Sequence, residues 1–234
     1  MVSARRHGLV ATVLLSLGAT ALDAALLALA LGGVPALLAH VRALTLLACW
    51  GVEGLVLALL APVRTQEVVA RTRENAGLLA ALGLLPIATA PLAALGERLA
   101  IWIVPGGAWL RWAGVAVSSG GLALRIAAMA QLGSRFSPLV AVQRQHPLET
   151  RGLYARLRHP GYLGSWLTAC GAMLAFGSAL GLLVLIPFSA LISARVRREE
   201  ALLERHFGDV YRRYRERTGA FVPRIGAPPI DADP

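Results

Sequence analysis

The sequence predicts an all-α membrane protein, a polytopic bundle of about five or six transmembrane helices with a helical hairpin near its C-terminus. Composition supports this class, because 56% of the 234 residues are hydrophobic and only 15% are charged, whereas a soluble domain has about 25% charged residues. Apolar runs recur along the first two thirds of the chain. Each is long enough to cross a hydrocarbon core of about 30 Å.

Six apolar runs are predicted to span the membrane. They lie at about 8–31, 36–61, 76–95, 108–131, 161–178 and 180–194. The first follows Arg5 and Arg6 like the start of a signal peptide. Its length of about 24 residues exceeds that of a secretory apolar region, so we expect an anchor that is retained. The last two runs are short and meet at Gly177 and Ser178, which predicts a helical hairpin.

The basic residues are all arginines, 23 in number, and the net charge is +10. If the N-terminus is cytoplasmic, the segments that hold 19 of them face the cytoplasm, as the positive-inside rule requires. Those segments are 1–7, 62–75, 132–160 and 195–234, and the other four arginines are Arg42, Arg98, Arg111 and Arg125. We therefore expect both termini in the cytoplasm, and anionic lipids rather than nucleic acid around these residues.

The stretch RHPGYLG at 158–164 is the first candidate site. Proline is tolerated in the first turn of a helix, so a helix is predicted to begin at Pro160. Arg158 and His159 would then lie at a helix N-terminus, where backbone N–H groups and the helix dipole favour an anionic group such as a carboxylate. The alternative is a basic anchor at the membrane surface.

A charged helix is predicted from Arg195 to about Thr218, ending before Gly219 and Pro223. It carries one apolar stripe, formed by Leu203, Phe207, Val210, Tyr211 and Tyr214. Glu200 projects about 36° from the centre of this stripe and Glu199 about 64° from it, at 100° per residue. A carboxylate near the middle of a buried stripe must be paired or used. The alternative is a simple ion pair between Arg195 and Glu199.

Other polar residues point less clearly to function. Asp23 and Glu53 fall inside predicted spans, where a charge is expensive, and they could pair with each other or with Arg42. His146 and His206 have no partner at metal-ligand spacing. Two cysteines, Cys49 and Cys170, lie in apolar runs and predict neither a disulfide nor a metal site. No metal is expected.

Taken in order, several stretches resemble the isoprenylcysteine carboxyl methyltransferase family and the related membrane phospholipid methyltransferases. They are LGSRF at 132–136, HPLETRGLY at 146–154, RHPGYLG at 158–164, RVRREE at 195–200, FG at 207–208, Tyr211, Tyr214 and VPR at 222–224. RHPxYxG alone is a weak signal, but its combination with REE and FGxxYxxY is specific. The resemblance divides the chain into N-terminal transmembrane helices at 1–120 and a methyltransferase region at 121–234.

The resemblance implies an integral membrane methyltransferase that binds S-adenosylmethionine at the cytoplasmic face, between the hairpin, the C-terminal helix and the preceding loop. The cofactor-binding residues it implies are Arg158, His159, Pro160, Tyr162, Leu163, Tyr211 and Tyr214. Arg195 and Glu200 would lie nearest the methyl acceptor. These two are about 140° apart on an ideal helix, so either the helix bends or they line different sides of one site.

The methyl acceptor implied by the resemblance is lipophilic or lipidated and enters from the bilayer. It is expected to be an isoprenylcysteine-like carboxylate, which Arg195 would orient by a bidentate contact. An amine, including a phospholipid headgroup, is the alternative, with Glu200 as general base. A transporter or binding protein would instead depend on Asp23 and Glu53, and a related reductase would need a nicotinamide cofactor. The sequence does not choose the acceptor or the oligomeric state.

Overall fold

The structure is a computed structural model that describes residues 2–60, 68–71, 76–133, 141–143 and 148–224. Six long helices make up most of it: α1 (Val2–Leu31), α3 (Val41–Leu60), α4 (Ala76–Arg98), α5 (Gly107–Leu132), α6 (Pro160–Phe176) and α7 (Leu182–Phe207). The shorter elements are α2 (Val34–Ala39), α8 (Asp209–Arg217), the 3-10 turns η2 (Gly152–Ala155) and η3 (Ala179–Gly181), and the strands β1 (Val68–Arg71) and β2 (Ala141–Gln143).

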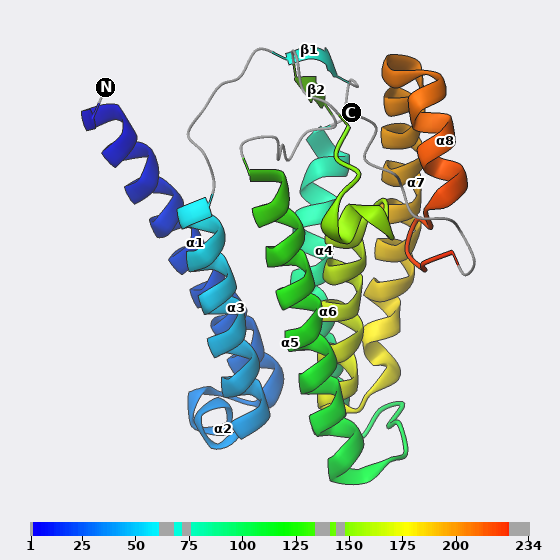
Figure 1. Cartoon of the computed structure of the whole chain (residues 1–234). Coiled ribbons are helices and arrows are strands. Elements are labelled where there is room, and N and C mark those ends of the chain that lie inside the picture. Colours follow the sequence, from blue (N-terminus) through cyan, green and yellow to red (C-terminus); the bar gives the residue numbers. More distant parts are fainter. Residues whose placement is uncertain (1, 61–67, 72–75, 134–140, 144–147, 225–234) are drawn as a thin grey trace.

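The long helices run up and down in chain order, so that the start of α1, the β1–β2 pair and α8 lie at one end of the bundle (Figure 1). Three helical segments of the described chain are long and apolar enough to cross a membrane, namely Thr12–Leu31, Gly107–Leu132 and Ala179–Phe207. Each of the six predicted spans overlaps one of the six long helices, but the ends differ, and α7 continues to Phe207, well past the predicted end at 194. The predicted hairpin is confirmed, because α6 ends at Gly177 in the left-handed conformation and α7 follows η3.

Two expectations about the elements are corrected. The predicted span 36–61 is two helices, because His40 leaves the helical conformation (φ −98°, ψ 85°) between α2 and α3. The charged helix does not begin at Arg195, since α7 runs unbroken through that residue and stops at Gly208 (φ 56°), where a left-handed conformation favours glycine. The described chain is helical as predicted, apart from a small antiparallel sheet in which β1 and β2 join two connecting segments.

Small residues allow α5 and α6 to pack backbone against backbone. An added Cβ at Gly121 would lie 2.6 Å from the Gly164 carbonyl oxygen, and one at Gly164 would lie 2.6 Å from the Gly121 carbonyl oxygen. Gly171 faces Ser118 in the same way. Close approach over small residues is a common way to hold helices together in lipid, where hydrophobic attraction between helices is absent. This pair forms the rigid centre that positions the start of α6.

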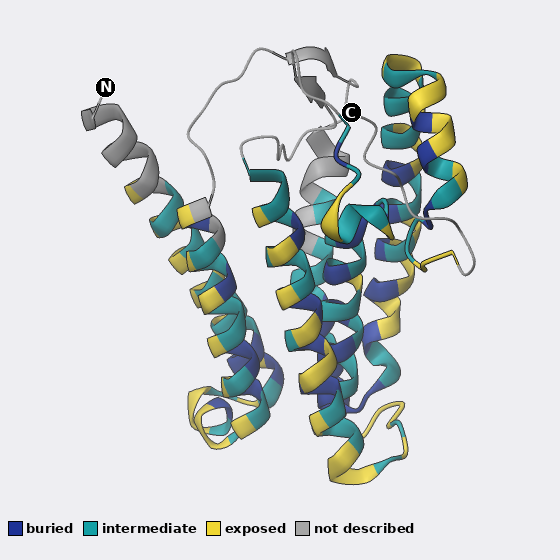
Figure 2. Cartoon of the chain, viewed as in Figure 1, coloured by how far each residue is buried: buried dark blue, intermediate teal, exposed yellow. Residues whose placement is uncertain are grey.

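Buried side chains gather where the helices face each other, and exposed residues cover the outward faces (Figure 2). Leu15, Leu29 and Ile186 are among the large apolar side chains exposed on those faces. Exposed apolar side chains along long helices are expected where the helices contact lipid rather than water.

A polar clamp closes the end of the bundle opposite α8. Glu97 of α4 accepts a hydrogen bond of 2.7 Å from Arg42 of α3 and lies 3.5 Å from Arg111 of α5. Both arginines also donate to the C-terminal end of α6, Arg42 to the Ala175 carbonyl at 2.6 Å and Arg111 to the Phe176 carbonyl at 2.8 Å. Cations are favourable there, because the last carbonyls of a helix carry partial negative charge. Arg42 therefore pairs with Glu97, and not with Asp23 or Glu53, which was one of the options that the sequence left open.

Candidate functional site

The start of α6 is built on a strand-like contact with the segment that follows α8. The amide of Arg158 donates to the Gly219 carbonyl at 2.8 Å, and the amide of His159 donates to the Ala220 carbonyl at 3.1 Å. Pro160 opens α6 as predicted and is fully buried. The backbone of the RHPGYLG motif is thus fixed by residues about 60 positions later in the chain, which holds Arg158 and His159 in place.

Glu200 of α7 accepts hydrogen bonds from both residues that precede α6. Its Oε1 atom lies 2.7 Å from Nε of Arg158 and 3.1 Å from Nε2 of His159. Arg158 also donates through Nη1 to the carbonyls of Arg215, at 3.1 Å, and Thr218. His159 and the side chain of Arg158 are almost completely buried. A charge-assisted network at this depth is stable only when each charge is satisfied, and here Glu200 supplies the negative charge.

A second group of side chains lies one turn further along α6. Arg195 donates from Nε to the hydroxyl of Tyr162 at 2.6 Å, and that hydroxyl donates to Oε2 of Glu199 at 2.9 Å. The guanidinium carbon of Arg195 is also 5.9 Å from the centre of the Tyr162 ring. Arg195 is buried. Tyr162 therefore connects the arginine to the carboxylate four residues later on α7.

The two tyrosines of α8 have different surroundings. The Tyr214 hydroxyl donates to the carbonyl of Tyr154 in η2 at 2.7 Å, which ties α8 to the segment before α6. The Tyr211 side chain is fully buried, and its hydroxyl has no hydrogen-bond partner among the described residues. Burial, and then the charge of Glu200, raise the pKa of Tyr211 above its ordinary value, so that its hydroxyl stays protonated near neutral pH.

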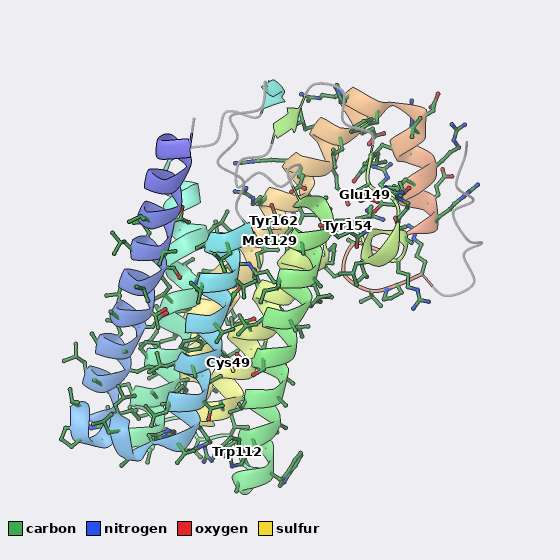
Figure 3. All side chains as sticks on the ribbon, turned by 60° about the vertical axis from the view of Figure 1, so that its left-hand side comes forward. Cys49, Trp112, Met129, Glu149, Tyr154 and Tyr162 are labelled. Carbon is green, nitrogen blue, oxygen red and sulfur yellow. The ribbon has the colours of Figure 1, made fainter. Side chains whose placement is uncertain are left out.

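The structure brings most of the predicted site residues to one end of the bundle. Figure 3 shows Tyr162 and Tyr154 there, beside the end of α5, and far from Trp112 at the other end. Arg195 and Glu200 do not face each other. Arg195 contacts Tyr162, whereas Glu200 contacts Arg158 and His159, so the two residues line different sides of the same region. Leu163 lies on the first turns of α6, half-buried.

Glu53 and His206, two other candidate residues that the structure describes, have different partners. Glu53 of α3 pairs with Arg125 of α5 at 3.0 Å, a partner that the sequence did not suggest. His206 packs edge-on against Phe207, and His146 lies outside the described residues. Within the described part of the chain, no three His, Cys, Asp or Glu residues are grouped as metal ligands would be.

Two parts of the site were missed from the sequence. The helical wheel puts Glu199 toward the edge of the apolar stripe, yet its carboxylate accepts a hydrogen bond from Tyr162. For the segment 218–221 the sequence predicts only the end of a helix. It provides the carbonyls that hold Arg158 and His159, and Phe221 places its ring 6.2 Å from that of His159. Its proximity to the motif depends on a contact between distant parts of the chain, for which the local sequence carried no signal.

Comparison with known proteins finds one family model that matches part of this region. Residues 114–205 match the isoprenylcysteine carboxyl methyltransferase (ICMT) family, which confirms the resemblance. Three of the similar proteins are protein-S-isoprenylcysteine O-methyltransferases. That of Schizosaccharomyces pombe is 39% identical over 105 residues, that of Saccharomyces cerevisiae 34% over 104, and that of Homo sapiens 30% over 126.

These matches span less than half of each relative, since they cover 44% of the length of each of the three proteins. They cover 44%, 43% and 53% of this chain, in the same order. The fold extends further. A solved structure of a eukaryotic intramembrane Ras methyltransferase, ICMT, superimposes with a TM-score of 0.50 over 77% of this chain and 68% of that chain, at 22% sequence identity. At this identity the likeness shows that the two chains share a helical fold.

Proposed function

We propose that this chain, whose residues 114–205 match the isoprenylcysteine carboxyl methyltransferase family, is an integral membrane enzyme that uses S-adenosylmethionine to methylate a carboxylate on a lipophilic acceptor. The observation that carries the proposal is that two adjacent glutamates of α7 accept hydrogen bonds from different partners. Glu200 accepts hydrogen bonds from Arg158 and His159, and Glu199 accepts one from Tyr162.

The region around Glu200 suits the methyl donor. S-adenosylmethionine would supply a methyl group on a positively charged sulfonium, together with a carboxylate and an adenine ring. The buried hydroxyl of Tyr211, which lacks a partner among the described residues, offers a donor to a polar ligand. His159 is the N-cap residue of α6, and the N-terminus of this helix favours a carboxylate. Glu200 keeps Arg158 and His159 in place beside that position.

The region around Arg195 suits the acceptor. A carboxylate is already ionised at neutral pH, and an arginine can hold it by two parallel hydrogen bonds. Tyr162 and Glu199 fix the guanidinium through Nε, so that Arg195 would meet the acceptor in one orientation. Transfer to such an acceptor needs alignment and exclusion of water rather than a base.

An amine acceptor fits this arrangement less well. An ammonium must lose a proton before it can attack, which requires a carboxylate that is available as a base. Glu200 would have to give up its bonds to Arg158 and His159 to fill that role. N-methylation of a phospholipid or another amine is therefore the alternative to carboxyl methylation.

A transporter that depends on charged residues within its spans is a second alternative. It would depend on Asp23 and on Glu53, whose carboxylate is paired with Arg125. We further propose that the end of the bundle with α8 faces the cytoplasm, as the arginine distribution favours, and that the apolar tail of the acceptor enters from the bilayer between the helices.

Methyl transfer by the purified full chain in lipid nanodiscs tests the proposal. The protein is first titrated by calorimetry with S-adenosylmethionine and with NADPH, and only the first is expected to bind. S-adenosylmethionine with a labelled methyl group is then supplied with an S-farnesylcysteine derivative or with phosphatidylethanolamine. A methyl ester releases volatile methanol in alkali, whereas an N-methyl group does not. Label that resists alkali in the phospholipid would contradict carboxyl methylation, and the absence of any binding would contradict the enzyme itself.

A further inference from the structure

The loop between α4 and α5 exposes an unusually apolar surface at the end of the bundle opposite the site. Its residues from 99 to 103 are all exposed, and Trp109 and Trp112 are exposed on the first turns of α5. Trp102 is 58% exposed and Trp109 71% exposed. Apolar surface of this extent is costly in water, so it indicates contact with something other than bulk solvent.

Hydrogen bonds hold this loop in one conformation against the connection between α6 and α7. Ser178 donates from Oγ to the Ile101 carbonyl at 2.7 Å, and the amide of Ala179 donates to the Trp102 carbonyl at 2.8 Å. The amide of Val104 donates to the Gly177 carbonyl at 2.9 Å. The exposed side chains therefore stand on a fixed backbone and are not free to turn inward.

The backbone of the loop is also unfavourable for the residues it carries. Ala100 and Trp102 have positive φ values of 55° and 47°, which residues other than glycine rarely adopt. Both residues would otherwise prefer a negative φ. The observed conformation also leaves the large aromatic ring of Trp102 exposed. Such a conformation is retained only where the surroundings favour it.

We propose that residues 99–112 form an interfacial anchor that lies at the headgroup boundary of the bilayer, on the side opposite the site. Tryptophan is enriched at this level of membrane proteins because its ring is apolar and its N–H is polar. Val117, about one turn beyond Trp112 on α5, is exposed as well. Arg98 is exposed beside the loop, where its charge can meet lipid phosphate.

The anchor also fixes the level of the site. A hydrocarbon core of about 30 Å corresponds to about 20 helical residues, so that a boundary at Trp109 places the other boundary near Met129 at the end of α5. Met129 and Tyr162 lie at nearly the same height in Figure 3. The site would then stand at the opposite headgroup level, within reach of both a water-soluble donor and an acceptor held in the bilayer. This inference requires only that the chain spans a membrane, and does not depend on methyl transfer.

Depth-dependent fluorescence quenching tests the anchor. The full chain is prepared with Trp102 as its only tryptophan, the other four being replaced by phenylalanine, and is placed in bilayers of phosphatidylcholine brominated either near the headgroup or near the chain end. Quenching by the shallow bromine is expected to exceed quenching by the deep bromine about twofold. A matched variant that keeps only Trp50, in the middle of α3, is expected to show no preference for the shallow bromine.

Three results would overturn the proposal. Quenching of Trp102 by aqueous acrylamide alone would place the loop in water. Stronger quenching by the deep bromine would place it inside the hydrocarbon. Protection of Trp102 from every quencher, together with a dimer in light scattering, would show that a second copy covers the loop. If the quadruple replacement does not fold, the same comparison is made with an environment-sensitive dye on Ile101→Cys, whose emission should shift to the blue on reconstitution into lipid.

Discussion

Glu200 accepts a hydrogen bond of 2.7 Å from Arg158, although the two residues are 42 positions apart. This bond joins the charged part of α7 to the segment just before the start of α6. The adjacent Glu199 contacts Tyr162 instead. Two neighbouring acids therefore serve two sides of the site, and variants of each should affect different steps of the proposed reaction.

Replacement of Glu200 by glutamine should weaken binding of the methyl donor. The change removes the negative charge that compensates Arg158, which is largely buried. We expect S-adenosylmethionine to bind at least about tenfold more weakly, or about 1.4 kcal/mol, by calorimetry. Glu204→Gln on the same helix is the control, because its partner Arg215 is partly exposed and such pairs contribute little. Equal affinities in the two variants would argue against this role for Glu200.

Replacement of Tyr162 by phenylalanine should affect the acceptor more than the donor. The variant keeps the ring but removes the hydroxyl. That hydroxyl accepts a hydrogen bond from Nε of Arg195 and donates one to Glu199. We expect the KM for an S-farnesylcysteine acceptor to rise or kcat to fall about tenfold, with donor affinity within about twofold of the parent. Ser165→Ala, which removes a hydroxyl bonded only to its own helix in the structure, is the control. A loss confined to donor affinity would contradict this assignment and support a direct contact of Tyr162 with the cofactor.

The sequence was sufficient for the features that depend on local patterns. Apolar runs of membrane length predicted the long helices, and Gly177 predicted the hairpin turn. The sequence also predicted that a helix begins at Pro160, as α6 does. Helical geometry further indicated that Arg195 and Glu200 need not face each other, and the structure shows that they contact different partners from one continuous helix.

Features that depend on contacts between distant segments were beyond the sequence. The angle of Glu199 from the apolar stripe was correct on a helical wheel, but a wheel does not show that Tyr162 lies against that edge. The pairing of Arg158 with Gly219 and of Glu53 with Arg125 likewise joins elements that are far apart in the chain. The break at Gly208 had a local signal in the glycine itself, which was outweighed by the apolar stripe that continues across it.

Removal of the Glu53 carboxylate should affect stability and not the proposed reaction. Glu53→Leu leaves the Arg125 guanidinium without its ion-pair partner between α3 and α5, and an uncompensated charge is unfavourable within a membrane span. We expect a lower Tm in nanodiscs for this variant, and partial recovery when Arg125→Met is added, with unchanged S-adenosylmethionine affinity at a temperature where both are folded. Loss of donor binding by a stable Glu53→Gln variant would instead connect this pair to the site.

Replacement by alanine should have opposite effects on stability at a buried glycine and at an exposed one. A Cβ at Gly171 would meet the Ser118 amide and lie 2.6 Å from the Gly114 carbonyl oxygen, whereas one at Gly120 would have nothing within 4 Å. Overpacking of this kind costs about 1–3 kcal/mol because the backbones must separate. Alanine in an open helical position is instead favourable by about 0.5–1 kcal/mol.

Thermal unfolding of Gly171→Ala and Gly120→Ala in the same nanodiscs measures this difference. The Tm of the first should fall and that of the second should stay or rise slightly. The packing of α6 against α5 positions the start of α6. The Gly171→Ala variant should therefore also bind S-adenosylmethionine more weakly below its Tm. A matching decrease in Tm for both variants would mean that alanine acts through the membrane-exposed surface, and that the close α5–α6 contact does not hold the bundle together.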